Sequence, residues 1–377
     1  MRAYDVASIA NKGVSQRIIS APFSPLGHDT HIASANATCV VLPTNQPIAP
    51  DRNKGELMRK TNQEQPFHPI YNYAFITDAE EGLILTDVNT LADREARNNY
   101  LTRALTWNQD GILNGARHLT IAGYVFYVAT PRGVVVLDMD DPLKPKVMAT
   151  IDLADARSSA LQFRYLFVAD SGGLSVVDVT KPSEPRVVPG AKVAMTDARR
   201  VYLARTFAYV AAGAEGLAIV DIEQVEKPKL YQLYNADGKI TDATDVIAAS
   251  TNASLFAYIA DGASGLHVVQ LTAPDTQPRY YGFSPDPKPE LIATRRTRWP
   301  ALSLSKALDR DRAVDETGHQ IAVFGRLGAR PFNSKEMQRL YLKNGKPWFV
   351  DDEPRMQSLI PSQPKRSAGR NSKNSLN

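Results

Sequence analysis

The sequence predicts an all-β protein, a β-propeller built of four-stranded blades. A glycine followed by an alternating apolar run recurs five times, at intervals of about 40–50 residues. An aromatic and β-branched segment precedes each copy, and a short turn containing Asp, Gly or Pro joins the two. These runs alternate with period two, which indicates strands rather than helices. Four short strands at this repeat length are typical of propeller blades.

The five copies of the glycine-led strand define the repeat. Each starts with Gly and Leu or Val, and the first four end in Asp, whereas the fifth ends in Gln270. The copies are residues 82–87, 133–138, 173–178, 216–221 and 265–270.

The other strands of each blade follow from the same alignment. The strand before each copy is expected at residues 73–76, 125–128, 165–168, 207–210 and 256–259. An earlier strand is visible at 117–122, 157–163 and 199–204, and a later one at 146–151, 186–189 and 229–234. Proline-marked loops precede the later strands, as expected because proline cannot donate to a central ladder.

The Gly-Leu-x-Ile/Val-Val-Asp core resembles the LVIVD repeat family over residues 70–272. That family occurs in bacterial and archaeal surface proteins and is expected to form β-propellers. The resemblance implies an extracytoplasmic or cell-surface location.

Residues 1–272 are predicted to hold the propeller repeats. Tyr4-Asp5-Val6 matches the end of a third strand, so a partial blade is expected at 1–23. No apolar segment typical of a signal peptide follows Arg2, and we expect that the chain begins inside a repeat. Residues 43–68 are polar and rich in proline, which predicts a long loop within the first full blade.

Residues 273–360 are predicted to form an irregular C-terminal extension. It includes a degenerate sixth repeat at 313–324, which would give six blades, and a short capped helix at 333–343. The composition of residues 361–377 predicts a disordered basic tail.

Charge and cysteine content narrow the function. The net charge is +4, and the tail at 361–377 accounts for all of it. A neutral body argues against a nucleic-acid partner, which requires a clustered basic face. Cys39 is the single cysteine, which excludes an intramolecular disulfide and cysteine-rich zinc sites. No apolar window is long enough for a transmembrane helix, and no cofactor motif is present, so neither is predicted.

The candidate binding residues lie where the innermost strands begin. Asp155-Ala-Arg157 and Asp197-Ala-Arg199 are equivalent, with Gly115-Ala-Arg117 and Asp242-Ala-Thr244 as variants. Such positions lie at one mouth of a propeller channel, where Arg117, Arg157 and Arg199 can hold a carboxylate or phosphate. Alternatively, acids and arginines of neighbouring blades pair with one another. The candidate ligand-binding residues are Arg117, Arg157, Arg199, Asp155, Asp197 and Asp242.

Other polar residues receive structural interpretations. The strand-end aspartates Asp87, Asp138, Asp178 and Asp221 recur once per blade, so we expect them to accept backbone N–H bonds in the following turn. His28 and His31 have a spacing compatible with a metal, but exposed loop polarity is the preferred interpretation, and no metal site is predicted. His267 is expected to be half-exposed on an alternating strand.

The predicted function is a non-catalytic binding or scaffold module whose partner is a protein or a small anionic ligand. Loops on a rigid propeller carry recognition. The alternative is a hydrolase or lyase that acts on a small anionic or sugar substrate at the central channel. That alternative requires a unique cluster, for example His118, Asp245 and a further acid.

Overall fold

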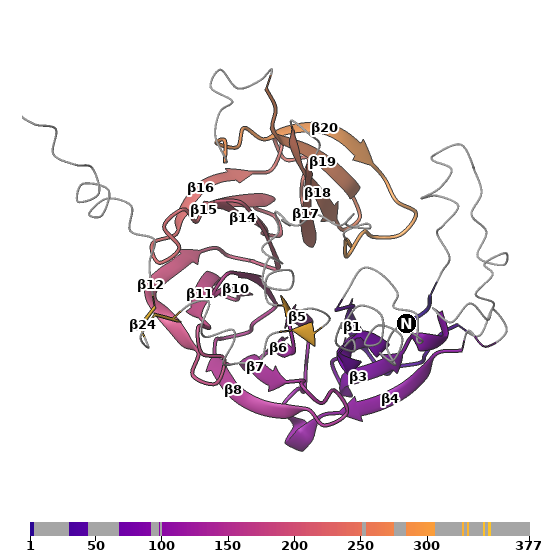
Figure 1. Ribbon diagram of the computed structural model, residues 1–377. Coiled ribbons are helices and arrows are strands. Elements are labelled where there is room, and N and C mark those ends of the chain that lie inside the picture. Colours follow the sequence, from indigo (N-terminus) through magenta and orange to yellow (C-terminus); the bar gives the residue numbers. More distant parts are fainter. Residues whose placement is uncertain are drawn as a thin grey trace, which may run out of the picture.

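The computed structural model describes residues 1–3, 30–43, 68–91, 98, 100–250, 254–274 and 284–305, and the backbone of four short strand segments beyond residue 325. The described chain forms five four-stranded antiparallel sheets. They follow one another around a common centre (Figure 1), and the first strands of successive sheets contact each other there. The predicted β-propeller architecture is confirmed.

Each sheet is one blade, numbered in chain order, and its strands run outward from the centre in sequence order. Blade one comprises β1 (Ala37–Val41), β2 (Tyr73–Asp78), β3 (Gly82–Asp87) and β4 (Thr102–Trp107). Blade two comprises β5 (His118–Ala122), β6 (Val125–Thr130), β7 (Gly133–Asp138) and β8 (Lys146–Asp152). Blade three comprises β9 (Ser158–Gln162), β10 (Tyr165–Asp170), β11 (Gly173–Asp178) and β12 (Arg186–Ala194). Blade four comprises β13 (Arg200–Ala204), β14 (Phe207–Ala211), β15 (Leu217–Asp221) and β16 (Lys229–Tyr234). Blade five comprises β17 (Asp245–Ser250), β18 (Leu255–Asp261), β19 (Gly265–Thr272) and β20 (Glu290–Arg295). Short 3-10 turns occur at η3 (Pro69–Asn72), η4 (Asn89–Leu91) and η6 (Gln109–Gly111).

All five blades share an irregularity between their third and fourth strands. The register shifts there in every sheet, for example between Val136 and Leu137 in blade two. A β-bulge bends and twists the strand that carries it. The outer strand of each blade therefore turns away from the plane of the inner three, as the curved outer arrows of Figure 1 show.

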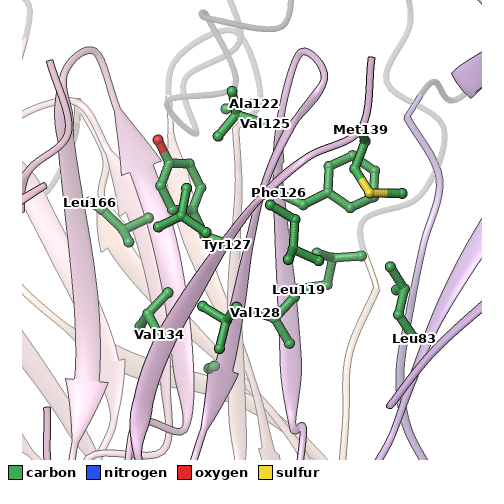
Figure 2. Packing of buried hydrophobic residues seen from close by; sticks show 14 of the residues in the cluster. Leu83, Leu119, Ala122, Val125, Phe126, Tyr127, Val128, Val134, Met139 and Leu166 are labelled. Atoms are coloured by element: carbon green, nitrogen blue, oxygen red, sulfur yellow. The ribbon is translucent and has the colours of Figure 1, made fainter. Parts of the chain in front are cut away.

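The core lies between blades rather than inside one sheet. Every residue of β6 is buried. Figure 2 shows its side chains between Leu83 of blade one and Leu166 of blade three. The rings of Phe75 and Phe126 meet edge to face across the first two blades, with centroids 4.6 Å apart. Middle strands covered on both faces explain why these segments are nearly continuous apolar runs.

Backbone hydrogen bonds join blades one and two, two and three, and four and five at one end of the propeller. The turn between the second and third strands supplies one partner, and the residue before the next inner strand supplies the other. Gly115 N donates to Ala79 O (2.7 Å), and Asp155 N donates to Pro131 O (3.0 Å). Gly213 and Ala243 bond reciprocally. These bonds fix where the inner strands β5, β9 and β17 begin.

The same bond marks the start of a further repeat. Gly262 and Ala301 bond reciprocally, at 3.0 and 2.8 Å, as Gly213 and Ala243 do. Ala301 thus stands where a sixth inner strand would begin. The predicted sixth repeat at 313–324 lies outside the described residues, so the blade number of six stays a prediction.

The edges of the predicted regions differ in detail from the structure. Blade five continues past residue 272, because its outer strand β20 ends at Arg295. Residues 333–341 of the predicted helix lie outside the described residues, and Leu342–Lys343 pair with Lys346–Pro347 as β23 and β24, so no helix extends to them. A second such pair joins β21 (Arg326–Leu327) to β22 (Arg330–Pro331).

The N-terminal partial blade and the two polar regions are described only in part. Of the partial blade, Met1–Ala3 are described, and they pair with Thr30–Ile32. Residues 44–67 of the predicted loop lie outside the described part, between β1 and η3, and so does the tail at 361–377.

Gly133 marks a close approach that a side chain would prevent. It has φ +132°, and a Cβ there would lie 2.0 Å from the carbonyl oxygen of Ile151 on the paired strand. Gly173 has the equivalent position in blade three, 2.0 Å from Val193 O. Such a contact can be relieved only by moving backbone.

We therefore expect Gly133→Ala to lower the free energy of unfolding by about 2–4 kcal/mol, through backbone strain and overpacking. Gly190 is the matched control, because its φ is +76° and a Cβ would meet nothing within 4 Å. Gly190→Ala should cost only about 1–2 kcal/mol. Urea denaturation of both variants checks this. Equal losses would contradict the close approach at Gly133.

Candidate functional site

The candidate residues lie in the segment that leads into each inner strand. An alanine stands at the centre of each tripeptide, and Ala116, Ala156, Ala198 and Ala243 are fully buried. The following residue starts the pairing within its own blade, since Arg117, Arg157 and Arg199 donate their backbone N–H to Ala129, Ala169 and Ala211, at 2.8–2.9 Å. Alanine burial and these bonds hold the flanking side chains in the same place in successive blades.

The structure brings all six predicted site residues together as a chain of ion pairs, here called the Arg–Asp ladder. Arg117 Nη1 donates to Asp155 Oδ1 at 2.6 Å, across the interface of blades two and three. Arg157 donates from Nε to Asp155 Oδ2 at 3.0 Å within its own blade. The ladder comprises, in order, Arg117, Asp155, Arg157, Asp197, Arg199 and Asp242.

The ladder continues in the same manner through blades four and five. Arg157 Nη1 donates to Asp197 Oδ1 at 2.6 Å, and Arg199 Nε donates to Asp197 Oδ2 at 2.8 Å. Arg199 Nη1 reaches Asp242 Oδ1 at 2.7 Å. Acids and arginines of neighbouring blades therefore pair, as one of the two sequence interpretations predicted. Binding of a ligand by the same residues stays a prediction.

Partial exposure limits what the ladder adds to stability. Its side chains are between 25% and 50% exposed. Pairs in such positions contribute about 0–1 kcal/mol each, because water screens them. The ladder is better described as a surface strip of charges held at fixed positions than as a support of the fold.

Asp155 and Asp197 are held in the ionised form by their arginine partners. Partial burial alone would raise the pKa of Asp155, but hydrogen bonds from Arg157 and Arg117 outweigh it and lower that pKa below its ordinary value. For Asp197 burial again opposes the shift, and hydrogen bonds from Arg199 and Arg157 lower the pKa. The hydrogen bond to Asp197 raises the pKa of the Arg199 guanidinium group. Partial burial acts in the opposite direction, and a second hydrogen bond, to Asp242, adds to the increase.

A buried histidine–aspartate pair holds the backbone at Asp242, the last acid of the ladder. Asp261 accepts from the backbone N–H groups of Thr241 (3.0 Å) and Asp242 (2.6 Å). His267 Nε2 lies 3.0 Å from Asp261 Oδ2, and its Nδ1 lies 2.9 Å from Thr294 Oγ1. The side chains of Asp261 and His267 are 0% and 2% exposed, so the expected half-exposed His267 is wrong. Burial does alternate along β19, but His267 lies on its buried face, together with Val269 and Leu271. The residues between them are only half-buried.

Blade three has a smaller version of this pair. Asp170 occupies the position of Asp261 and accepts from Ser175 Oγ, which stands where blade five has His267. Lys192 on the outer strand also contacts Asp170, at 2.9 Å. Both groups were missed in the sequence analysis. A signal was present, because the Asp that ends the second strand is followed by Ser or His as the third residue of the glycine-led strand in blades three and five.

The residues named for a catalytic cluster have separate partners. His118 Nδ1 accepts from Ser159 N at 3.3 Å. Asp245 Oδ2 accepts from Ser303 Oγ (2.9 Å) and from Leu304 N (2.8 Å), in the segment after Ala301. Within the described ranges, no group of three or more His, Cys, Asp or Glu residues is placed to hold a metal ion. Of the predicted metal-spaced pair, His31 is exposed and His28 lies outside the description.

The strand-end aspartates act as the sequence predicted. Asp87, Asp138, Asp178 and Asp221 each accept the backbone N–H of the second residue after them, at 2.8–2.9 Å. Their structural role is confirmed. Cys39 lies on β1 and is partly buried.

Loss of the Asp261 carboxylate should destabilise the protein strongly. Asp261→Ala leaves two backbone N–H groups and His267 buried without this partner, so we expect the free energy of unfolding to fall by about 3 kcal/mol or more. Asp221→Ala is the control, because that partly exposed carboxylate accepts from Glu223 N alone among the described contacts, and should cost about 1 kcal/mol. Chemical denaturation measures both. Similar losses would show that the buried pair is unimportant.

Acid should weaken the first blade through Glu81. Glu81 lies in the turn after β2, and Arg103 hydrogen-bonds to it and lowers its pKa from 4.5 to about 2, helped by Ala35 N. A carboxyl group with a lowered folded pKa stabilises above its unfolded pKa and loses that effect as pH falls. The difference in unfolding free energy between the wild type and Glu81→Gln should thus shrink from pH 5 to pH 2. A constant difference would contradict the pairing.

Comparison with known proteins finds a family match for part of the chain. The LVIVD repeat matches residues 155–189 and 196–235. No curated protein matches the chain, and no helix within the described ranges is long and apolar enough to cross a membrane.

Among solved structures, the chain resembles the β-propeller domain of Cps50 (Swd1) from Myceliophteria thermophila, at 11% identity and a TM-score of 0.42, over 71% of this chain and 74% of that one. It also resembles a protein from Lactobacillus plantarum (12% identity, TM-score 0.43, 60% and 68% covered). A third is the extracellular domain of BT4673, assigned to a hybrid two-component system of B. thetaiotaomicron (11%, 0.38, 63% and 28%). No function is carried over from these distant structures. The resemblance indicated by the repeated core is confirmed by the family match, and the chain carries LVIVD repeats in its third and fourth blades.

Proposed function

We propose that this chain is a non-catalytic binding module that acts outside the cytoplasm and recruits a partner protein through the propeller face that carries the Arg–Asp ladder. The ladder itself is the observation that supports this. It places six charged side chains, each 25–50% exposed, along one face at positions fixed by four successive blades. A preformed strip of alternating charge favours specificity and register at an interface more than stability of the fold.

The chemistry of the ladder favours recognition over catalysis. A general base works best with a pKa near the operating pH. The pKa values of Asp155 and Asp197 are instead lowered, which keeps both carboxylates ionised and poorly suited to proton transfer. The residues also repeat from blade to blade, whereas a catalytic group is normally unique.

The shape of this face also supports recognition. The turns between second and third strands open on it, together with the connections that lead into the inner strands. Loops held by a rigid scaffold are common binding surfaces. The location outside the cytoplasm rests on the LVIVD repeats, which are typical of surface proteins.

Site-specific photo-crosslinking tests the proposal. A photoreactive phenylalanine analogue at Ala214 or Ala263, exposed turn residues on the ladder face, should form a discrete adduct in the extracytoplasmic fraction of the host. The same analogue at Leu143 or Glu184, exposed on the opposite face, should not. The double variant Arg157→Ala/Asp197→Ala keeps the net charge and should weaken the ladder-face adduct about tenfold. Adducts that survive this change, or that form equally from both faces, would overturn the proposal.

A further inference from the structure

Within the ladder, each complete arginine uses two edges of its guanidinium group. The Nε edge binds the aspartate two residues earlier in its own blade, at 3.0 Å for Arg157 and 2.8 Å for Arg199. The Nη1 atom binds the aspartate of the next blade, at 2.6 and 2.7 Å. The two blades thus repeat one geometry, in which a carboxylate faces the Nε edge.

Arg117 has half of this arrangement. Its Nη1 donates to Asp155 at 2.6 Å, as the repeat requires. Two residues earlier, however, stands Gly115, so no carboxylate of its own blade faces the Nε edge. The Arg117 side chain is 37% exposed, and among the described contacts Asp155 is its one carboxylate partner.

The absence of an acid at residue 115 follows from the packing of blade two, and a single substitution cannot restore it. Gly115 has φ +77°, a left-handed conformation that Asp155 shares at φ +59°. The backbone is therefore compatible with aspartate, but a Cβ at Gly115 would lie 2.7 Å from Pro131 Cγ. Blade three has Ser171 at the position of Pro131, and that serine bonds to Ala154 O without blocking Asp155.

We propose that the Nε edge of Arg117 is a binding position for a carboxylate of the ligand, which takes the place that Asp155 and Asp197 occupy in the following blades. This inference rests on the proposed function and names the chemistry that the ladder face recognises. Carboxylate is favoured over other anions because the neighbouring blades fill the equivalent position with a carboxylate, and because a guanidinium edge binds one with two parallel hydrogen bonds.

Arginine side-chain NMR tests the proposal. The protein is labelled with ¹⁵N-arginine, and Arg117→Lys identifies the Arg117 Nε–H signal. Acetate and a blocked Gly-Glu-Gly tripeptide are titrated separately, with chloride at equal ionic strength as the control. We expect a saturating shift of the Arg117 signal with carboxylate and not with chloride, while the Arg157 and Arg199 signals stay in place.

A matched pair of variants distinguishes binding at the Nε edge of Arg117, here called the slot, from general effects of charge. Gly115→Asp with Pro131→Ser makes blade two like blade three and should fill the slot, which should weaken carboxylate binding at least about tenfold. Pro131→Ser alone leaves the slot open and should bind as the wild type does.

Each result of the titration has a defined meaning. A shift with acetate at the lower concentration assigns the slot to a small free carboxylate, and one with the tripeptide at the lower concentration assigns it to an acidic side chain of a partner; both support the slot. Arginine signals that move together, or an Arg117 signal that does not move, would overturn it. That failure would leave the crosslinking result intact, whereas loss of the ladder-face adduct would overturn the proposed function whatever Arg117 binds.

Discussion

The close contact between one blade's turn and the start of the next inner strand sets the geometry of the rest. At that contact an alanine is completely buried in each of four blades, namely Ala116, Ala156, Ala198 and Ala243. Backbone hydrogen bonds lock the contact, such as those between Gly213 and Ala243. Because the alanine is fixed, the residues on either side of it meet their counterparts in the next blade. The ladder is thus a consequence of how blades join.

Two kinds of interaction stabilise each blade, apolar packing and buried polar contacts. The apolar middle strands, packed against both neighbours, supply most of the free energy of folding. Polar groups beneath the ladder are satisfied locally, and their partners change together from blade to blade. Asp170 is matched by Ser175 and Lys192, whereas Asp261 is matched by His267 and Thr294. Asp78, the buried acid at this position in blade one, accepts instead from the backbone N–H groups of Asn36, Glu80 and Glu81. A buried acid therefore needs several donors at this position, but their source differs between blades.

The sequence predicts the repeated parts of the fold better than its edges. The second and third strands of all five blades were predicted because their apolar runs align in register. The inner strands β1 (Ala37–Val41) and β17 (Asp245–Ser250) and the outer strands β4 (Thr102–Trp107) and β20 (Glu290–Arg295) were not assigned. Long or irregular segments separate β1, β4 and β20 from the repeat core. His267 was misjudged because alternation alone does not tell which face of β19 is buried, and the histidine lies on the buried one with Val269 and Leu271.

The candidate site was predictable in composition but not in its exact pairing. Aligning Asp155-Ala-Arg157 with Asp197-Ala-Arg199 places acids and arginines at equivalent positions, and both pairing and ligand binding follow from that alignment. The choice between them depends on side-chain reach across an interface, which spacing does not encode. The partner of Asp261 lies on another strand, so only the fold reveals that it orients the backbone of Asp242.

The positions at which the Arg–Asp ladder ends are as informative as the ion pairs within it. Thr38 and Thr244 stand where blades two to four have arginine, and their hydroxyls donate to Ala116 O (2.8 Å) and Ala301 O (3.0 Å) of the following repeat. Threonine therefore satisfies the backbone at these interfaces without extending the charge series. The ladder is confined to three interfaces and ends in a cation at Arg117 and an anion at Asp242. An uninterrupted ring of such pairs would give every charge two partners, whereas here Arg117 and Asp242, at opposite ends of the same strip, each have one charged partner among the described contacts and are 37% and 50% exposed.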